Sequence, residues 1–241
     1  MELRLLVEEI YGPASRDLPG LSFGRAYWSA TAAFPYGGDV VDVFHYANCC
    51  TSVAVIDISG HGIRSAKHAG LIKHALRAYV SQGYDALAAI RALNRLCIES
   101  CTFEGESDFF ATAFFAIVDA ERQTMDYVSA GHEGACLVRG EGRRSFYATG
   151  PILGLLDDDL AFRQETLSLE SGDIIAAVTD GFTEARNEGL EFLGAAALAG
   201  IIEEHRDRTA VEQADAVVLH AFNYAGPRLA DDVAAVVLRV T

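Results

Sequence analysis

Short apolar runs, many of them alternating with polar residues, recur along the chain. Several of these runs are bounded by Gly, Pro, Asn or Asp, which is typical of β-strands that end in turns. The pattern predicts strands over residues 22–30, 40–47, 51–58, 110–119, 124–130, 135–139, 144–149, 163–169, 173–180 and 232–240.

Three segments instead repeat apolar residues at steps of three and four, the spacing of one helix face. They predict helices over residues 63–80, from an N-cap at Asp85 onward, and over about 208–223. No repeat, low-complexity tract or linker divides the chain. We therefore expect a single α+β domain, a β-sandwich of two layered sheets flanked by helices.

Acidic residues stand where four of the predicted strands begin or end. Asp57 closes the apolar run of "SVAVIDISGHG", and Asp180 closes that of "IIAAVTDGFTEARN". Asp39 follows two glycines in "PYGGDVVDVF", and Asp231 and Asp232 precede the last strand in "LADDVAAVVLRV". Each acid could simply open a turn, because Asp and Gly are common turn residues. Four such sites instead favour convergence on one cleft.

Several carboxylates brought together repel one another and raise each other's pKa, unless divalent cations neutralise them. An oxygen-only ligand set indicates Mg²⁺ or Mn²⁺, and two such ions can activate a water for attack on phosphorus. Gly60 and Gly62 would let the backbone approach the ions, and the carbonyl of Ile58 is a further candidate ligand.

Composition narrows the range of partners. The 241 residues carry 19 basic and 34 acidic side chains, a formal net charge of −15, which disfavours nucleic acid and anionic membranes as partners. The apolar run 109–118 is too short to span a bilayer, and the first residues lack a signal-peptide layout. The five cysteines do not indicate a disulfide framework, and no Cys/His pair completes a zinc set with Cys97 and Cys101. We expect a cytoplasmic protein.

Seven motifs occur in an order and spacing that resemble the metal-dependent Ser/Thr protein phosphatases, the PPM family, and more narrowly its bacterial SpoIIE/RsbU-like branch. They are "GGDVVD", "DISGHG", "FATAFFAIVD", "AGHEGA", "GPILGLL", "DGFTEARN" and "ADDVAAVVLRV", and the resemblance covers about residues 20–240. It implies two mainly antiparallel sheets flanked by helices, two Mn²⁺ or Mg²⁺ ions, and hydrolysis of phosphoserine or phosphothreonine. Residues 1–20 would be a short extension without a separate sensor domain.

The resemblance also implies roles for individual residues. Asp57 would bridge the ions beside the carbonyl of Ile58, with Asp180 and Asp231 as further ligands and Asp39 binding directly or through water. Asp57 and Asp180 are the expected catalytic carboxylates. Residues expected to support the ligands from behind are Asp42, Ser59, Gly60, His61, Gly181 and Asp232.

Some positions depart from the family pattern. Ser59 stands where eukaryotic members place a proposed general acid, and His61 lies two residues further on, so a structural role is expected for His61. His132 in "AGHEGA" is likewise expected to be structural. Ala234 replaces a common Ser or Thr, which predicts a missing hydrogen bond behind the ligands.

Members of this branch typically act on a phosphorylated anti-sigma antagonist, a small STAS domain, or a related scaffold, and the resemblance implies such a partner here. A basic cluster on the helix after "DISGHG" is either a solvated face or a docking face for an acidic partner; it consists of Arg64, Lys67, Lys73 and Arg77.

Two other functions share some of these sequence features with a phosphatase. Ala234 and the altered "AGHEGA" allow a catalytically impaired module that only binds phosphoproteins, although all four ligand-type acids are retained. A nucleotide cyclase would continue "GGD" with Glu-Phe, whereas Val40 and Val41 follow here.

Overall fold

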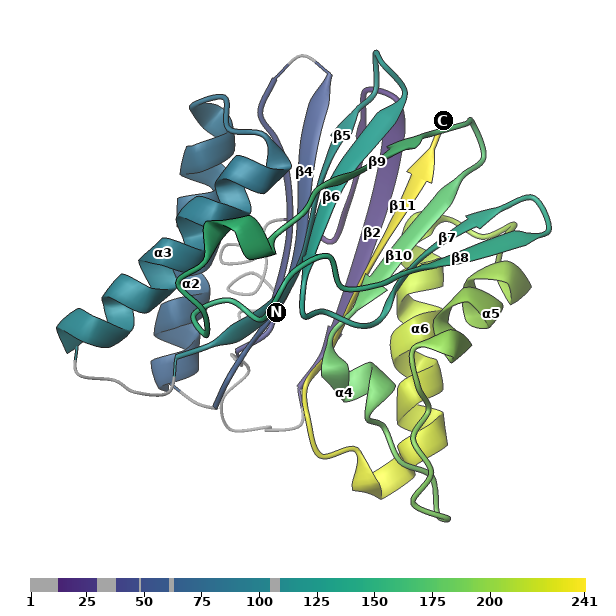
Figure 1. Cartoon of the computed structure of the whole chain (residues 1–241). Coiled ribbons are helices and arrows are strands. Elements are labelled where there is room, and N and C mark those ends of the chain that lie inside the picture. Colours follow the sequence, from purple (N-terminus) through teal and green to yellow (C-terminus); the bar gives the residue numbers. More distant parts are fainter. Residues whose placement is uncertain (1–12, 30–37, 48, 61–62, 105–108) are drawn as a thin grey trace.

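The computed structural model describes residues 13–29, 38–47, 49–60, 63–104 and 109–241. Two antiparallel sheets lie face to face, as Figure 1 shows. One sheet has the order β1-β2-β11-β10-β7-β8 and the other β3-β4-β5-β6-β9, which confirms the predicted α+β sandwich. The strands of the first sheet are β1 Ser15–Leu18, β2 Leu21–Trp28, β7 Ala135–Arg139, β8 Gly142–Phe146, β10 Ile174–Val178 and β11 Val233–Val240. Those of the second are β3 Val40–His45, β4 Cys50–Ile58, β5 Ala111–Asp119, β6 Thr124–Ala130 and β9 Glu165–Ser168.

The two faces of each strand enter different parts of the core, because successive side chains point to opposite faces of a sheet. In β4, Val53 and Val55 pack between the sheets, whereas Ala54 and Ile56 pack beneath helices. Like β4, the other central strands of the two sheets are therefore apolar on both faces. This is why they appear in the sequence as nearly continuous apolar runs.

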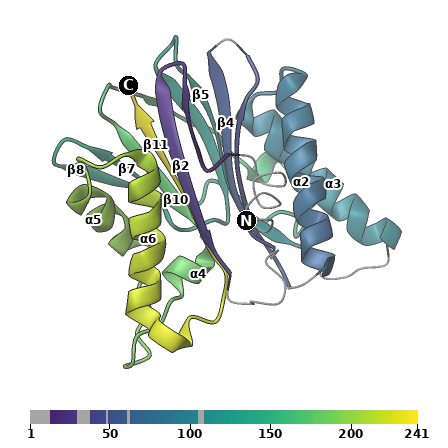
Figure 2. The ribbon, with the colours of Figure 1, turned by 180° about the vertical axis from the view of Figure 1, so that it is seen from behind.

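Two layers of helices cover the outer faces of the sheets (Figure 2). α2 (Ile63–Ser81) and α3 (Ala86–Glu104) pack on the five-stranded sheet. α5 (Ala196–Glu204) and α6 (Ala210–Ala225) pack on the six-stranded sheet. The remaining helical elements are α4 (Asp180–Thr183), η1 (Asp159–Ala161) and η2 (Gly226–Arg228). Among the described residues, no helix is both long and apolar enough to cross a bilayer.

The helix boundaries follow local capping chemistry. Asp85 accepts a hydrogen bond from the backbone N–H of Ala88 at 2.7 Å, as predicted for the start of α3. Thr209 and Glu212 form a reciprocal capping box at the start of α6. Five short elements were not predicted: β1, α4, α5, η1 and η2. β1 lies within the segment expected to be an extension, and α5 is a nine-residue helix too short to show a clear period.

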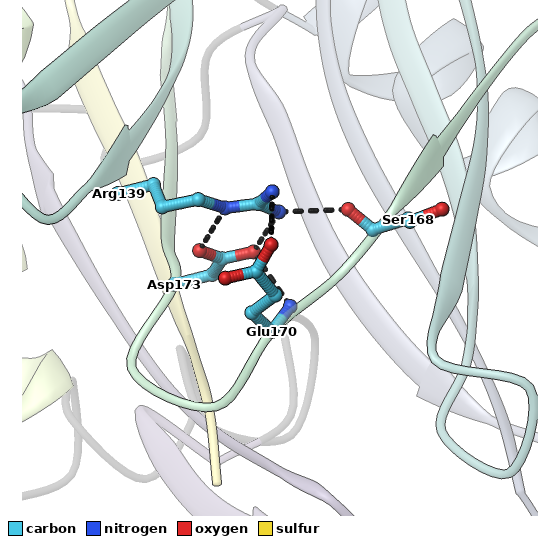
Figure 3. Close-up of polar contacts among 4 residues, drawn as sticks. All are labelled: Arg139, Ser168, Glu170 and Asp173. Carbon is cyan, nitrogen blue, oxygen red and sulfur yellow. Dashed lines mark hydrogen bonds and ion pairs between the residues drawn. The ribbon is translucent and has the colours of Figure 1, made fainter.

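An ion pair between the buried Asp173 and the partly exposed Arg139 joins the two sheets at the crossover from β9 to β10 (Figure 3). Arg139 at the end of β7 donates through Nε and Nη2 to both carboxylate oxygens of Asp173, at 2.7 and 2.5 Å. The same guanidinium donates to Glu170 and to the carbonyl of Ser168, the last residue of β9. Because Asp173 is only 1% exposed, this pair replaces the water that the carboxylate has lost.

Replacing Arg139 should therefore destabilise the fold strongly. We expect Arg139→Ala to lower the free energy of unfolding by about 2–3 kcal/mol, because the buried Asp173 carboxylate would lose its charged partner and keep the hydrogen bond from the backbone N–H of Glu170. Arg122→Ala is the matched control, since the Arg122 side chain is 81% exposed and pairs with Asp119 at the surface. It should cost less than about 1 kcal/mol. Equal losses in the two variants, measured by urea unfolding, would contradict this account.

Candidate active site

Four of the predicted acids lie close enough to feel each other's charge, and one of them, Asp180, is the first residue of α4 (Figure 1). Asp39 immediately precedes β3, and Asp57 is the second-last residue of β4. The two strands are antiparallel neighbours in which Val40 pairs with Ile56. Continuing that antiparallel register places Asp39 opposite Asp57. Asp180 follows β10 as the first residue of α4, and Asp231 precedes β11. The acids thus come from both sheets and share one electrostatic environment.

Burial and mutual repulsion raise the pKa values of Asp39, Asp57 and Asp180 in the metal-free chain. Asp39 is 5% exposed, and its pKa is raised well above 3.8, first by burial and then by the charge of Asp57. The pKa of Asp57 is raised to about 8, by burial and then by the charge of Asp180. Burial and the charge of Asp231 raise the pKa of Asp180. The fold therefore holds like charges together at a site that strongly favours a cation.

One oxygen of this cluster is buried and unpaired. Among the described residues, Asp39 Oδ2 has no hydrogen-bond partner, although the side chain of Thr179 hydrogen-bonds to the same carboxyl group. An orphaned buried carboxylate oxygen is costly in a folded protein. Divalent cations such as Mg²⁺ and Mn²⁺ take oxygen ligands of this kind. The residues present thus fit such an ion.

Two glycines allow the backbone to come close at this end. A Cβ atom at Gly181 would lie 2.0 Å from the carbonyl oxygen of Asp232, so only glycine lets α4 start against β11. A Cβ atom at Gly38 would lie 2.6 Å from the carbonyl oxygen of Ile58, the predicted backbone ligand. The glycine beside Asp39 therefore keeps the space next to that carbonyl open.

Thr179 supplies a contact that the sequence did not predict. It is fully buried, and its hydroxyl accepts a hydrogen bond from the backbone N–H of Ala234 at 3.0 Å. The same side chain hydrogen-bonds to Asp39 and lowers its pKa relative to burial alone. The Thr179 hydroxyl, at the end of β10, thus connects β11 to Asp39. Residue 234 takes part through its backbone N–H, so its side chain is not needed for this contact. The only sequence signal was a polar residue between an apolar strand and Asp180.

Asp232 lies beside the cluster with partners of its own. It accepts hydrogen bonds from the Tyr27 hydroxyl at 2.5 Å and from Ser29 Oγ at 3.0 Å. Its backbone N–H donates to Asp231 Oδ1 at 2.8 Å, which orients the more exposed carboxylate of Asp231. Asp232 thus takes the supporting position, and Asp231 is the acid whose charge is felt by Asp39, Asp57 and Asp180.

Asp42 lies away from these acids. Its carboxylate accepts hydrogen bonds from Arg77 Nε and Nη2 at 2.7 and 2.6 Å, and Lys73 Nζ lies 3.6 Å away. Asp42 is on the face of β3 that carries Val40 and packs under α2, because alternation places residues 40 and 42 together. The expectation that Asp42 supports the ligands is not met by this position.

The same contacts change the interpretation of the basic cluster. Lys73 is 6% exposed, and burial lowers its pKa despite the opposing effect of Asp42. Arg77 also stacks over the ring of Phe44 at 4.8 Å. Lys73 and Arg77 therefore hold α2 on β3, and they are not free to form a docking face. Arg64 and Lys67 are exposed.

The segment after Asp57 turns sharply onto β5. Ser59 accepts a hydrogen bond from the backbone N–H of Phe110 through Oγ, and its own N–H donates to the carbonyl of Phe110. Gly60 has φ of +91°, a conformation that favours glycine. Ser59 therefore serves the turn in the position of the proposed eukaryotic general acid. His61 lies outside the described residues.

His132 is buried next to this end of the sheet. Its Nδ1 lies 3.3 Å from Thr112 Oγ1, and Thr112 is the cross-strand partner of Asp57. Burial lowers the pKa of His132 to about 4, so the ring is neutral at pH 7. A neutral, fully buried ring fits the expected structural role.

Glu184 is a further acid that the sequence did not single out. It is exposed, one turn after Asp180, and its charge raises the pKa values of both Asp57 and Asp180. The "DGFTEARN" motif contained it, but a Glu beyond a strand end gave no separate signal.

Comparison with known proteins assigns the class. The SiaA-PP2C domain of Pseudomonas aeruginosa shares the fold with a TM-score of 0.78 at 18% identity, covering 99% of this chain and 90% of that one. The RsbU and RsbW domains of Rv1364c from Mycobacterium tuberculosis also give a TM-score of 0.78, at 24% identity, over 94% of this chain and 62% of that one. The fold is thus that of PP2C-type phosphatase domains.

The sequence comparison assigns a family within this fold class. The family model for stage II sporulation protein E (SpoIIE) matches residues 48–241, and the chain belongs to this family. It is 30% identical to phosphoserine phosphatase RsbU of Bacillus subtilis over 203 residues, 82% of this chain and 58% of RsbU. It is 25% identical to protein IcfG of Synechocystis over 195 residues, 69% of this chain and 31% of IcfG. The chain therefore spans about a third to just over half of these relatives.

Metal binding should be linked to pH through the raised pKa of Asp57. Below that pKa the folded metal-free chain binds more protons than the unfolded chain, so its stability falls as pH rises from 3.8 to about 8. Mn²⁺ replaces these protons. We expect Mn²⁺ to raise the unfolding temperature more at pH 8 than at pH 6, and to release protons on binding at pH 7.

Calorimetric titration with Mn²⁺ in buffers of different ionisation enthalpy measures the released protons. The Asp57→Asn variant should release fewer. A Mn²⁺ effect on unfolding temperature that is the same at both pH values, with no proton release, would show that the acids are already ionised and separate.

Proposed function

We propose that this chain is a Mn²⁺- or Mg²⁺-dependent protein phosphatase that hydrolyses phosphoserine or phosphothreonine. The single observation that carries the proposal is the convergence of Asp39, Asp57, Asp180 and Asp231 from both sheets, with a buried, unpaired oxygen on Asp39. Such a set of acids stays ionised together at neutral pH only when cations neutralise it.

Relatives support both the reaction and the ions. RsbU and RsbP of Bacillus subtilis are named phosphoserine phosphatases. The catalytic domain of the serine/threonine phosphatase PstP, which shares the fold with a TM-score of 0.68, is described in complex with two manganese ions. RsbX, with a TM-score of 0.70, is described in complex with magnesium. We extend a pair of Mn²⁺ or Mg²⁺ ions to this chain on the chemistry of its own acids.

The residues of the site would have two roles, binding the ions and positioning the residues that bind them. Asp57, Asp180, Asp231 and Asp39 would hold the ions, with the carbonyl of Ile58 as a further ligand. When bound, such ions supply a nucleophilic water near neutral pH and offset charge on the phosphoryl oxygens. Thr179 holds Asp39, and Asp232 holds Asp231 through its backbone N–H. The neutral ring of His132 adds no positive charge behind Asp57.

For the substrate, we propose a phosphorylated signalling protein, of the STAS anti-sigma antagonist type or a related scaffold. One structural neighbour combines RsbU and RsbW domains, and another belongs to the bacterial stressosome. With this substrate the chain would act in the cytoplasm. A single catalytic domain over residues 1–241 stays a prediction.

A module that binds phosphoproteins without turnover is the second candidate. Its motivation was the missing hydroxyl at Ala234, but Thr179 Oγ1 contacts the backbone N–H of Ala234 directly. Thr179, which follows β10, also hydrogen-bonds to Asp39, so a hydroxyl group supports this acid from another part of the chain. This favours a working catalyst.

Asp57→Asn should remove catalysis and leave the fold intact. Asp57 would hold both ions, so its replacement should weaken the binding of each ion. The value of kcat/KM for Mn²⁺-dependent hydrolysis of a phosphoserine peptide should therefore fall by ~10²-fold or more. Asp85→Asn is the matched control, because it makes the same chemical change and Asn caps a helix as well as Asp. Hydrolysis at the parent rate in the Asp57 variant would exclude the proposed site.

Thr179 should act as a positioning residue for Asp39. Thr179→Val keeps the shape but removes the hydroxyl, and we expect apparent Mn²⁺ affinity to fall ~10- to 100-fold with a smaller change in kcat at saturating Mn²⁺. Thr179→Ser should restore the affinity because it restores the hydroxyl. If Val and Ser behave alike, the hydroxyl does not hold the ligand.

A further inference from the structure

A second cluster of ligand-type side chains lies at the far end of β4 from Asp57. Cys49 and Cys50 stand where the β3–β4 turn enters β4, and Asp119 ends β5. Cys50 and Asp119 are cross-strand partners, so both side chains lie on one face of the sheet. Asp57 lies seven positions after Cys50 in β4, which is about 23 Å along the strand. The two clusters are therefore separate sites.

The distances among these groups suit a shared cation. The ligand atoms of Cys49, Cys50 and Asp119 all lie within 4.8 Å of one another. The two Sγ atoms are 4.0 Å apart, too far for a disulfide, whose sulfur atoms are about 2.05 Å apart. Two thiolates bound tetrahedrally to Zn²⁺ at about 2.3 Å stand about 3.8 Å apart. The observed spacing is close to this value.

The turns around the cluster hold it in place before any ion binds. Asp119 Oδ1 accepts hydrogen bonds from the backbone N–H groups of Glu121 and Arg122, which fixes the carboxylate in the β5–β6 turn. The carbonyl of Cys49 accepts a hydrogen bond from the N–H of Ala120 at 2.9 Å, which ties the two turns together. Asp119 Oδ2 faces the exposed Arg122 side chain at 3.5 Å, a contact that is weak in water.

The environment of the cluster favours added positive charge. Loss of hydration, then Cys50, Asp119 and Glu121, raises the pKa of the Cys49 thiol to about 11. Burial, then Cys50, Asp119 and Cys49, raises the pKa of Tyr46 to about 12. A thiophilic ion would reverse this effect, since it displaces the thiol protons and neutralises the thiolates.

We propose that Cys49, Cys50 and Asp119 form a binding site for a thiophilic divalent cation of the Zn²⁺ type. Two thiolates and one carboxylate oxygen supply three ligands, and water completes four-coordination. Each thiol releases its proton on binding. Soft sulfur ligands select Zn²⁺ or Cd²⁺ here, whereas the oxygen ligands at the other end of β4 select Mg²⁺ or Mn²⁺. This inference does not depend on the proposed phosphatase activity.

Cd²⁺ is the probe, because its bonds to thiolates absorb in the ultraviolet and its bonds to carboxylates do not. One equivalent of Cd²⁺ added to the reduced full chain with Mn²⁺ present should produce the absorption, and Zn²⁺ should compete it away. Cys49→Ser/Cys50→Ser should abolish it. Asp119→Asn should weaken Cd²⁺ binding at least ~10-fold, while Asn still caps the turn. Cys101→Ser is the matched control and should bind as the parent does.

A second measurement covers the case in which the double variant does not fold. In the parent chain, Zn²⁺ should protect Cys49 and Cys50 from alkylation, as read by peptide mass spectrometry. Absence of the absorption at one equivalent of Cd²⁺, its persistence in the folded double variant, or unprotected Cys49 and Cys50 under Zn²⁺ would each overturn the proposal.

Discussion

Mutual repulsion among buried and partly buried carboxylates is the constraint on which the candidate site of this chain depends. A sandwich with two apolar faces per sheet is stable without them, and an isolated strand gains nothing by ending in Asp. Yet Asp39, Asp57 and Asp180 are held where burial and each other's charges raise their pKa values. The fold thus accepts a local loss of stability, which a bound cation would recover.

The rest of the architecture keeps that arrangement in register. Pairing of β3 with β4 sets Asp39 against Asp57, while β10 and β11 bring Asp180 and Asp231 from the opposite sheet. Arg139 and Asp173 fix the crossover between the sheets at the other end. Asp42 and the basic side chains of α2 fix the helix layer on β3. Loss of the Arg139–Asp173 pair or of the Asp42 contacts with α2 would shift the acids of one sheet relative to those of the other.

Much of the fold and the acid cluster could be predicted from the sequence, because each buried strand is a visible apolar run and each acid marks its end. The partners of the acids could not. Asp42, three residues after Asp39, was expected to support the ligands, but its carboxylate pairs with Arg77 on the face of β3 that packs under α2. The role of Thr179 could not be predicted from the polar residue alone, since it requires β11 to lie beside β10. The Cys49–Cys50–Asp119 cluster depends on strand pairing across 69 residues of sequence.

The most direct test of the central claim is a crystal structure of the chain grown with Mn²⁺, with the ions located by anomalous scattering. The account predicts two Mn²⁺ ions bound among Asp39, Asp57, Asp180 and Asp231, with Asp39 Oδ2 directed at an ion or at a water bound to it. Well-ordered carboxylates that point apart into solvent, with no anomalous peak between them, would contradict it.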